Sequence, residues 1–194
     1  MLYRQSNALT LDDYKCLVAI AQRLQPKRML EFGPGFSTYA WIEAGVPEIV
    51  TLECHDEWRG KKEAEFADYP SVTVLPYWNE APEARVPEEI GEFDLAFVDS
   101  PRGQGNPDAV VHPGQEDYNR LNTLITATKL SPVTIIHDAV RVRERNSLAY
   151  VEKLGFDVHY INVAGRSYGI AQVICPKHAM NLSTKPSETS DHCR

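Results

Sequence analysis

The chain has 194 residues, of which 43% are hydrophobic and 24% are charged, so one domain can bury a full core without disulfide or metal support. Its 27 acidic and 20 basic side chains give a net charge of −7, which argues against a general basic surface for nucleic acid. No apolar run approaches the length of a membrane span, the N-terminus has no apolar signal segment, and the four cysteines form no C-x-x-C motif, so we expect a cytoplasmic protein with no membrane attachment.

The first half of the chain alternates between helical and extended patterns. Thr10, with an acidic residue three positions later, predicts a capped helix over 11–24 that Pro26 ends. The elements expected next are a strand at 28–32, a helix at 37–44, a strand at 48–54, a helix at 57–68 and a strand at 71–76.

The second half continues this alternation and ends differently. We expect a strand at 93–99, a helix at 115–129, a strand at 132–137, a helix at 142–154 and strands at 156–163 and 168–175. The alternation predicts an α/β fold with a doubly wound, mainly parallel, Rossmann-like sheet. The last two strands, joined by a short connector with Gly165, predict a hairpin that adds an antiparallel strand.

The sequence indicates a single domain over residues 1–175. The polar, aperiodic tail at 176–194 is expected to be disordered. Two long loops, 77–92 and the Gly- and Pro-rich 100–114, follow strands, and such loops often form substrate sites or lids.

The most informative segment is Glu31–Thr38, EFGPGFST, at the turn from the first strand to a helix. Gly33 and Gly35 let the backbone approach a ligand, and Ser37 can cap the helix. Glu53 ends the second strand, where an acid can bind ribose hydroxyls. Because ligands bind at the carboxyl ends of strands in such sheets, we predict a nucleoside cofactor here rather than an ordinary glycine turn.

Glu31 distinguishes between cofactors. A pyrophosphate on this turn would lie close to its carboxylate, and the repulsion is costly where water is excluded. The dinucleotide fingerprint also has Gly or Ala at its sixth position, where this chain has Thr38. S-adenosylmethionine (SAM) carries no phosphate and has two cationic groups, so we predict SAM in contact with Glu31.

The segments LEFGPGFSTYAWIEAG, TLECHDEW and FDLAFVDSPRG resemble motifs of the class I SAM-dependent methyltransferases over residues 11–175. The resemblance implies a seven-stranded sheet of order 3-2-1-4-5-7-6 with strand 7 antiparallel. Aromatic groups after the second and third strands could flank the adenine, whereas Trp41 is expected in the core. The predicted cofactor contacts are Glu31, Gly33, Pro34, Gly35, Ser37, Thr38, Glu53, Cys54, Trp58, Tyr77, Trp78, Asp99 and Ser100.

The second half resembles the plant glucuronoxylan 4-O-methyltransferase family more narrowly. The matching stretches are DSPRG at 99–103, HDAVRVRE at 137–144 and GRSY at 165–168. The third match has one inserted position, the first glycine motif reads Gly-Pro-Gly where the plant family has Gly-Leu-Gly, and the plant membrane anchor has no counterpart here. This resemblance implies a saccharide acceptor, such as a uronic acid, or another acidic small molecule.

Transfer of a methyl group to a hydroxyl requires removal of a proton, by a base or with the help of a metal. Asp99, His137 and Asp138 follow the fourth and fifth strands, whose ends are adjacent in the predicted sheet. His137 could act as the base, and Asp99 could orient the acceptor or contact the cofactor ammonium. The same three residues could instead bind a divalent metal.

The predicted reaction is SAM-dependent O-methylation of a small-molecule or saccharide acceptor, with no nucleic-acid partner. Arginines near the predicted site could bind an acceptor carboxylate through paired hydrogen bonds. The predicted substrate contacts are Arg102, Tyr118, Arg141 and Arg166. Another SAM-using enzyme, for N-methylation or cofactor cleavage, and a non-catalytic SAM-binding protein are the alternatives.

Overall fold

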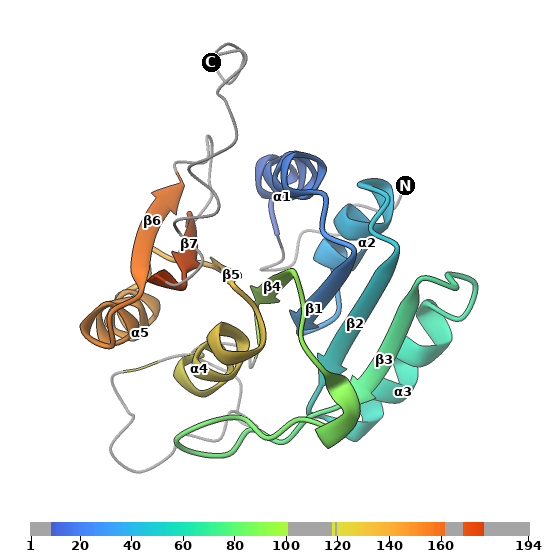
Figure 1. Ribbon diagram of the computed structural model, residues 1–194. Helices are drawn as coiled ribbons and strands as arrows, with labels where there is room; N and C mark the ends of the chain where they lie inside the picture. Colours follow the sequence, from blue (N-terminus) through green and yellow to red (C-terminus); the bar gives the residue numbers. More distant parts are fainter. Residues whose placement is uncertain (1–8, 101–117, 119, 162–168, 177–194) are drawn as a thin grey trace.

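A computed structural model describes residues 9–100, 118, 120–161 and 169–176. Seven strands form one sheet in the order β3-β2-β1-β4-β5-β7-β6 (Figure 1). The strands are β1 (Arg28–Phe32), β2 (Glu48–Glu53), β3 (Val72–Pro76), β4 (Leu95–Val98), β5 (Val133–His137), β6 (Asp157–Ile161) and β7 (Ile170–Ile174). The α/β class and the strand order that the family resemblance implied are both confirmed.

The sheet is parallel from β3 through β5. β7 is antiparallel to β5 on one side and to β6 on the other. The predicted antiparallel C-terminal strand is therefore confirmed. The connector with Gly165 and the tail from residue 177 lie outside the described residues.

Alternate residues of each central strand enter two separate cores, as a strand with both faces covered requires. On β1, Met29 packs with α1 (Leu11–Leu24) and α2 (Phe36–Glu43), and Leu30 packs with α4 (Leu121–Leu130) and α5 (Val142–Lys153). In Figure 1 these helix pairs lie on opposite faces, and α3 (Asp56–Glu65) runs beside β3. Trp41 is fully buried in the first core, as predicted.

The predicted start of α1 is confirmed. The Thr10 hydroxyl accepts a hydrogen bond from the Asp13 amide, and the Asp13 carboxylate accepts one from the Thr10 amide. This reciprocal cap satisfies two amide groups at the helix N-terminus that have no partner within the helix.

The helix expected over 115–129 begins later than predicted. Tyr118 is not helical, and Arg120 has a left-handed backbone (φ 60°) before α4 begins at Leu121. Residues 115–117 lie outside the described part. The apolar pattern correctly predicted the buried face of α4 but not its N-terminus. Arg120 lies before the helix, where its side chain forms ion pairs with Asp99 and Asp138.

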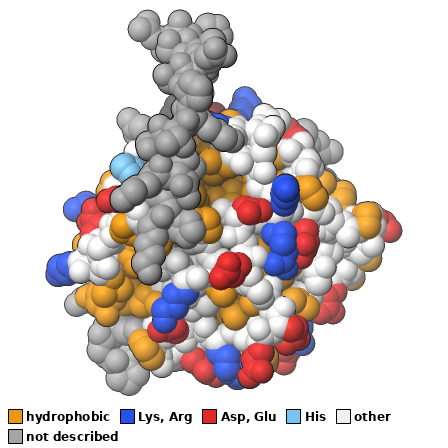
Figure 2. All heavy atoms as spheres, in the orientation of Figure 1, with side chains coloured by type: hydrophobic (Ala, Val, Ile, Leu, Met, Phe, Trp, Pro, Cys, Tyr) orange, Lys and Arg blue, Asp and Glu red, His pale blue; other side chains and the backbone are white. Residues whose placement is uncertain are grey.

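On the face seen in Figure 2, the described Lys and Arg side chains are interspersed with Asp and Glu and form no single basic patch. Among the helices that the structure describes, none combines the length and the apolar character needed to cross a membrane.

Candidate functional site

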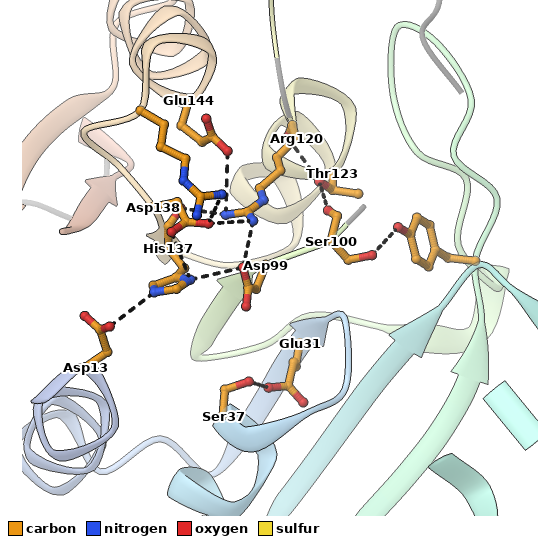
Figure 3. A network of polar contacts seen from close by, with 12 residues as sticks. Asp13, Glu31, Ser37, Asp99, Ser100, Arg120, Thr123, His137, Asp138 and Glu144 are labelled. Carbon is orange, nitrogen blue, oxygen red and sulfur yellow. Dashed lines mark hydrogen bonds and ion pairs between the residues drawn. The ribbon is translucent and has the colours of Figure 1, made fainter. Parts of the chain in front are cut away.

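The carboxyl ends of β1, β4 and β5 bring the predicted catalytic residues together. The Asp99 amide donates to the Phe32 carbonyl at 3.0 Å, which places Asp99 beside the glycine turn. His137 ends the neighbouring strand, and its Nδ1 lies 3.2 Å from Oδ1 of Asp99. Asp138 completes this group, as Figure 3 shows.

The turn after β1 requires glycine for steric reasons. Gly33 has a φ of +93°, and a Cβ at this position would lie 2.7 Å from Cβ of Ser100. Gly33 therefore allows β1 and the end of β4 to approach each other. A Cβ at Gly35 would meet nothing within 4 Å, so the backbone of this turn has open space in front of it.

Glu31 has a different role from the one predicted. It is fully buried, and its carboxylate accepts hydrogen bonds from Oγ of Ser37, Oγ1 of Thr38 and Nε1 of Trp41 at 2.6, 2.6 and 2.9 Å. Burial raises the pKa of Glu31, and these donors oppose the shift. The expected direct contact between Glu31 and a cationic cofactor is therefore wrong in this structure. Glu31 instead anchors α2 to β1.

Three of the neighbouring predicted contacts are also buried, namely Pro34, Ser37 and Thr38. The two hydroxyls belong to the Glu31 network. Thr38 also accepts a hydrogen bond from the Gly35 amide at 3.0 Å. These residues support the turn from the protein interior, and their own side chains face away from a ligand at the turn.

The end of β2 presents an oriented carboxylate. Glu53 is half-buried, and its Oε1 accepts a hydrogen bond from the His55 amide at 2.9 Å. Cys54 is exposed next to it. This contact orients the Glu53 carboxylate at the end of β2, where an acid can bind ribose hydroxyls.

The aromatic candidates divide into two kinds. Trp58 and Trp78 are 47% and 40% exposed, and each lies under a cation, Lys61 and Arg85 respectively. Tyr77 is 1% exposed, and its edge-on packing against Phe32 excludes the predicted stacking on adenine in this structure.

Tyr77 instead fixes the turn after β4. Its hydroxyl lies 2.9 Å from Oγ of Ser100, and the Ser100 carbonyl accepts a hydrogen bond from Thr123 of α4 at 2.9 Å. Ser100 is itself only 6% exposed. The segment that carries Asp99 is thereby held from both sides (Figure 3).

The site also contains a buried arginine, Arg120, that was not predicted from the sequence. Nη2 of Arg120 lies 2.8 Å from Oδ1 of Asp99 and 3.0 Å from Oδ2 of Asp138, and Nη1 donates to the His137 carbonyl at 2.7 Å. Glu144 lies 4.0 Å from the same guanidinium. Burial would raise the pKa of Asp99, but Arg120 and His137 outweigh it and lower that pKa.

His137 lies between two carboxylates. Its Nε2 is 3.4 Å from Asp13 of α1, and its Nδ1 faces Asp99. Burial lowers the pKa of His137, but Asp99, Asp13 and Asp138 outweigh this effect and raise the pKa to about 10. An imidazolium that is charged at neutral pH cannot accept a proton, so the structure does not support His137 as the base.

This pKa makes stability depend on pH. A histidine whose pKa is higher in the folded than in the unfolded state stabilises the fold fully below about pH 6.5, and that contribution is lost as pH rises through about 10. We expect wild type to lose roughly 2–4 kcal/mol more unfolding free energy than His137→Gln over this range. Urea unfolding at both ends of the range measures the difference, and equal pH slopes would contradict the ion pairing.

Two of the four predicted substrate residues are described. Arg141 precedes α5, and its Nη1 lies 2.8 Å from Oδ2 of Asp138, with its side chain 34% exposed. Tyr118 packs edge-on against Tyr150 at 5.9 Å between ring centroids. Arg102 and Arg166 lie outside the described residues.

Arg120 and Asp13 carried no clear sequence signal. Asp13 matched a capping box, which explained it without any contact to the site. Arg120 fell inside a predicted helix, where an arginine usually faces solvent.

The donor types of Asp99, His137 and Asp138 would suit a divalent cation, since ligand atoms of all three lie within 4.8 Å of one another. Arg120, however, already contacts both carboxylates. A divalent ion about 4 Å from a guanidinium meets a repulsion of about 8 kcal/mol at an effective dielectric constant of about 20. A metal ion between these carboxylates would therefore have to displace the Arg120 guanidinium, which already neutralises them.

No protein-family model matches this sequence, and no curated protein does. Solved structures do resemble the fold. The O-methyltransferase TomG from Streptomyces achromogenes, involved in tomaymycin synthesis and solved with SAM, is 18% identical with a TM-score of 0.59, over 86% of this chain and 81% of TomG. An O-methyltransferase from Bacillus cereus, solved with S-adenosylhomocysteine (SAH), is 18% identical with a TM-score of 0.60, over 88% of this chain and 84% of that one.

A third similar structure is the SAH-bound methyltransferase PaMTH1 from Podospora anserina, which is 22% identical with a TM-score of 0.53, over 83% of this chain and 76% of that one. At these identities the likeness concerns the fold. The chain therefore has the fold found in SAM-dependent methyltransferases.

Proposed function

We propose that this chain is a SAM-dependent O-methyltransferase of a small-molecule or saccharide acceptor. The observation that carries the proposal is the row of groups at the ends of three neighbouring strands. The glycine turn follows β1, Glu53 ends β2, and Asp99 follows β4. In an open parallel sheet, ligands bind along this edge.

The cofactor would lie across these three strand ends. The turn at Gly33 and Gly35 offers backbone without a Cβ, and Glu53 is oriented to accept hydrogen bonds from ribose hydroxyls. The exposed rings of Trp58 and Trp78 follow β2 and β3, where they could flank an adenine. Bound SAM would supply an electrophilic methyl group.

Asp99 is the acid with access to the reacting groups. Its side chain is 26% exposed, whereas those of His137 and Asp138 are 6% and 5% exposed. Both close contacts to Asp99 involve Oδ1, which leaves Oδ2 to accept the proton of an acceptor hydroxyl or to orient it. His137 and Asp138 are positioning residues in this proposal.

The acceptor class rests on basic groups near Asp99. Arg141 keeps part of its guanidinium exposed beside Asp138, where it could contact an acceptor carboxylate. Arg102 and Arg166 were predicted to serve the same purpose. A uronic acid or another acidic hydroxyl compound fits this chemistry.

Titration calorimetry with SAH tests the cofactor site. We expect Glu53→Ala to weaken binding by about 1–3 kcal/mol, because ribose hydroxyls lose a charged acceptor. Glu63→Ala on the exposed surface of α3 is the matched control and should bind like wild type. Binding of NAD in place of SAH, or unchanged affinity in Glu53→Ala, would refute the proposed site.

A panel of acidic saccharides with a labelled methyl donor tests the acceptor class. Label transfer to a hydroxyl of a uronic acid is the expected result. SAH binding with no transfer to any hydroxyl, amine or carboxylate compound would indicate a non-catalytic binding protein instead.

A further inference from the structure

Arg120 lies where a bound cation would be expected, between the two carboxylates of the site. A single atom, Nη2, is within 3.0 Å of both Asp99 and Asp138. These are two of the three residues whose donor atoms could surround a divalent ion. One ionised nitrogen thus bridges the carboxylates that a metal would bridge.

Burial and several hydrogen bonds hold Arg120 in this position. Its side chain is 3% exposed, and Nη1 donates to the His137 carbonyl. Its own carbonyl accepts hydrogen bonds from Oγ1 of Thr123 and from the Leu124 amide. Contacts on both its backbone and its guanidinium therefore tie Arg120 to α4 and β5 (Figure 3).

The backbone around this contact is strained. Only three non-glycine residues in the described part have positive φ, and Arg120 (60°) and Asp138 (61°) are two of them. Left-handed backbone is unfavourable for residues with a Cβ and persists where surrounding contacts impose it. Here both residues adopt it at the two ends of one ion pair.

The charges of the neighbouring side chains favour a cation at the position of the Arg120 guanidinium. The carboxylates of Asp99, Asp138 and Glu144 lie within 4.0 Å of the Arg120 guanidinium. Asp13 pairs with His137 next to them, and Arg141 pairs with Asp138. Removal of the Arg120 guanidinium would leave a surplus of buried negative charge. Buried carboxylates without a partner bind cations or adopt another arrangement.

We propose that Arg120 takes the place of a divalent metal in this site, so that the chain binds no metal between Asp99 and Asp138 and uses the guanidinium to hold Asp99 in position. The inference rests on the proposed function only for the role of Asp99. The exclusion of metal is a property of the free protein.

Binding of Mn²⁺ to the free chain, followed by electron paramagnetic resonance, tests the exclusion. We expect no saturable binding to wild type. Arg120→Met, which keeps the unbranched aliphatic stem of the side chain without the charged guanidinium, should gain saturable Mn²⁺ binding. Arg141→Met removes the neighbouring guanidinium that pairs with Asp138, and it should gain no such binding.

Wild type alone can overturn the inference, even if Arg120→Met does not fold. Tight Mn²⁺ binding to wild type that Asp99→Asn abolishes would mean that the arginine moves aside for a metal. Failure of folded Arg120→Met to gain Mn²⁺ binding would also overturn it.

A separate measurement distinguishes failure of this inference from failure of the proposed function. SAH calorimetry on the same wild-type sample, with and without EDTA, should give equal affinities. Absence of SAH binding would refute the methyltransferase proposal and leave the Mn²⁺ result standing. If methyl transfer is found, EDTA should leave its rate unchanged, and a rate lost in EDTA and restored by Mn²⁺ would refute the exclusion of metal.

Discussion

Glu31→Ala should lower the free energy of unfolding by about 3 kcal/mol or more. The substitution leaves Ser37, Thr38 and Trp41 without their shared acceptor, and each buried unsatisfied donor costs about 1–3 kcal/mol. The two hydroxyls can rotate toward other acceptors, but the indole N–H is fixed by the packing of Trp41, which is fully buried. Urea unfolding followed by circular dichroism gives the change from the midpoint and slope.

Glu48→Ala is the matched control for this experiment. Glu48 is also a strand glutamate, but it forms an ion pair with Arg28 near the surface, and its side chain is 46% exposed. Exposed pairs of this kind contribute about 0–1 kcal/mol. A loss in Glu31→Ala no larger than in Glu48→Ala would contradict the anchoring role of Glu31.

The hydrogen bonds to Glu31 also hold the glycine turn that is proposed to bind the cofactor. Ser37 and Thr38 connect Glu31 to the first turn of α2, and Thr38 also holds the Gly35 amide. Glu31→Gln, which keeps the size of the side chain, should remain folded while loosening this turn. It should therefore bind SAH more weakly than wild type, even though the side chain of Glu31 is fully buried.

Asp99→Asn should reduce kcat/KM for methyl transfer by about 10²–10⁴, the range that a general base contributes. The amide keeps the shape of the carboxylate and can still contact Arg120 through its oxygen, but it cannot accept a proton. Steady-state kinetics with the acceptor identified in the saccharide panel measures the effect, and SAH calorimetry establishes that the cofactor site remains formed.

Asp157→Asn at the exposed start of β6 is the control for loss of one carboxylate and should react like wild type. His137→Gln separates positioning from proton transfer. Since His137 carries its proton at neutral pH, its loss should reduce the rate less than loss of Asp99 does. A larger loss in His137→Gln, with Asp99→Asn fully active, would assign the base to His137 and contradict this account.

The predictions that held depended on local patterns. Alternation of apolar runs with amphipathic segments predicts strands and helices, and the pair of strands after residue 155 predicted an antiparallel hairpin. The antiparallel strand β7 lies between β5 and β6 and not at the edge of the sheet. The capping box at Thr10 is a contact between residues three positions apart, so the sequence contains all of it. Strand ends also placed Asp99 and His137 together, because neighbouring parallel strands end at one edge of the sheet.

The predictions that failed concerned the direction in which side chains point. Glu31 was expected to face a ligand, but its position on β1 directs it toward α2, where three donors lie six to ten residues away. Tyr77 follows β3 and was expected to face an adenine, yet it turns inward onto Phe32 and Ser100. A strand end specifies the edge of the sheet, and packing decides which side chains are exposed there.

The amino-acid pattern alone determined the fold class, the antiparallel hairpin at the C-terminal end of the sheet and the strand ends at which polar groups meet, since periodicity and turns act over a few residues. The tertiary structure alone decided the electrostatics of that edge. His137 and Asp13 are 124 residues apart in the chain, and Arg120 pairs with Asp138 across 18 residues and with Asp99 from another strand end. Such charges acquire their pKa values and their partners only when folding removes water between them, which no local pattern encodes.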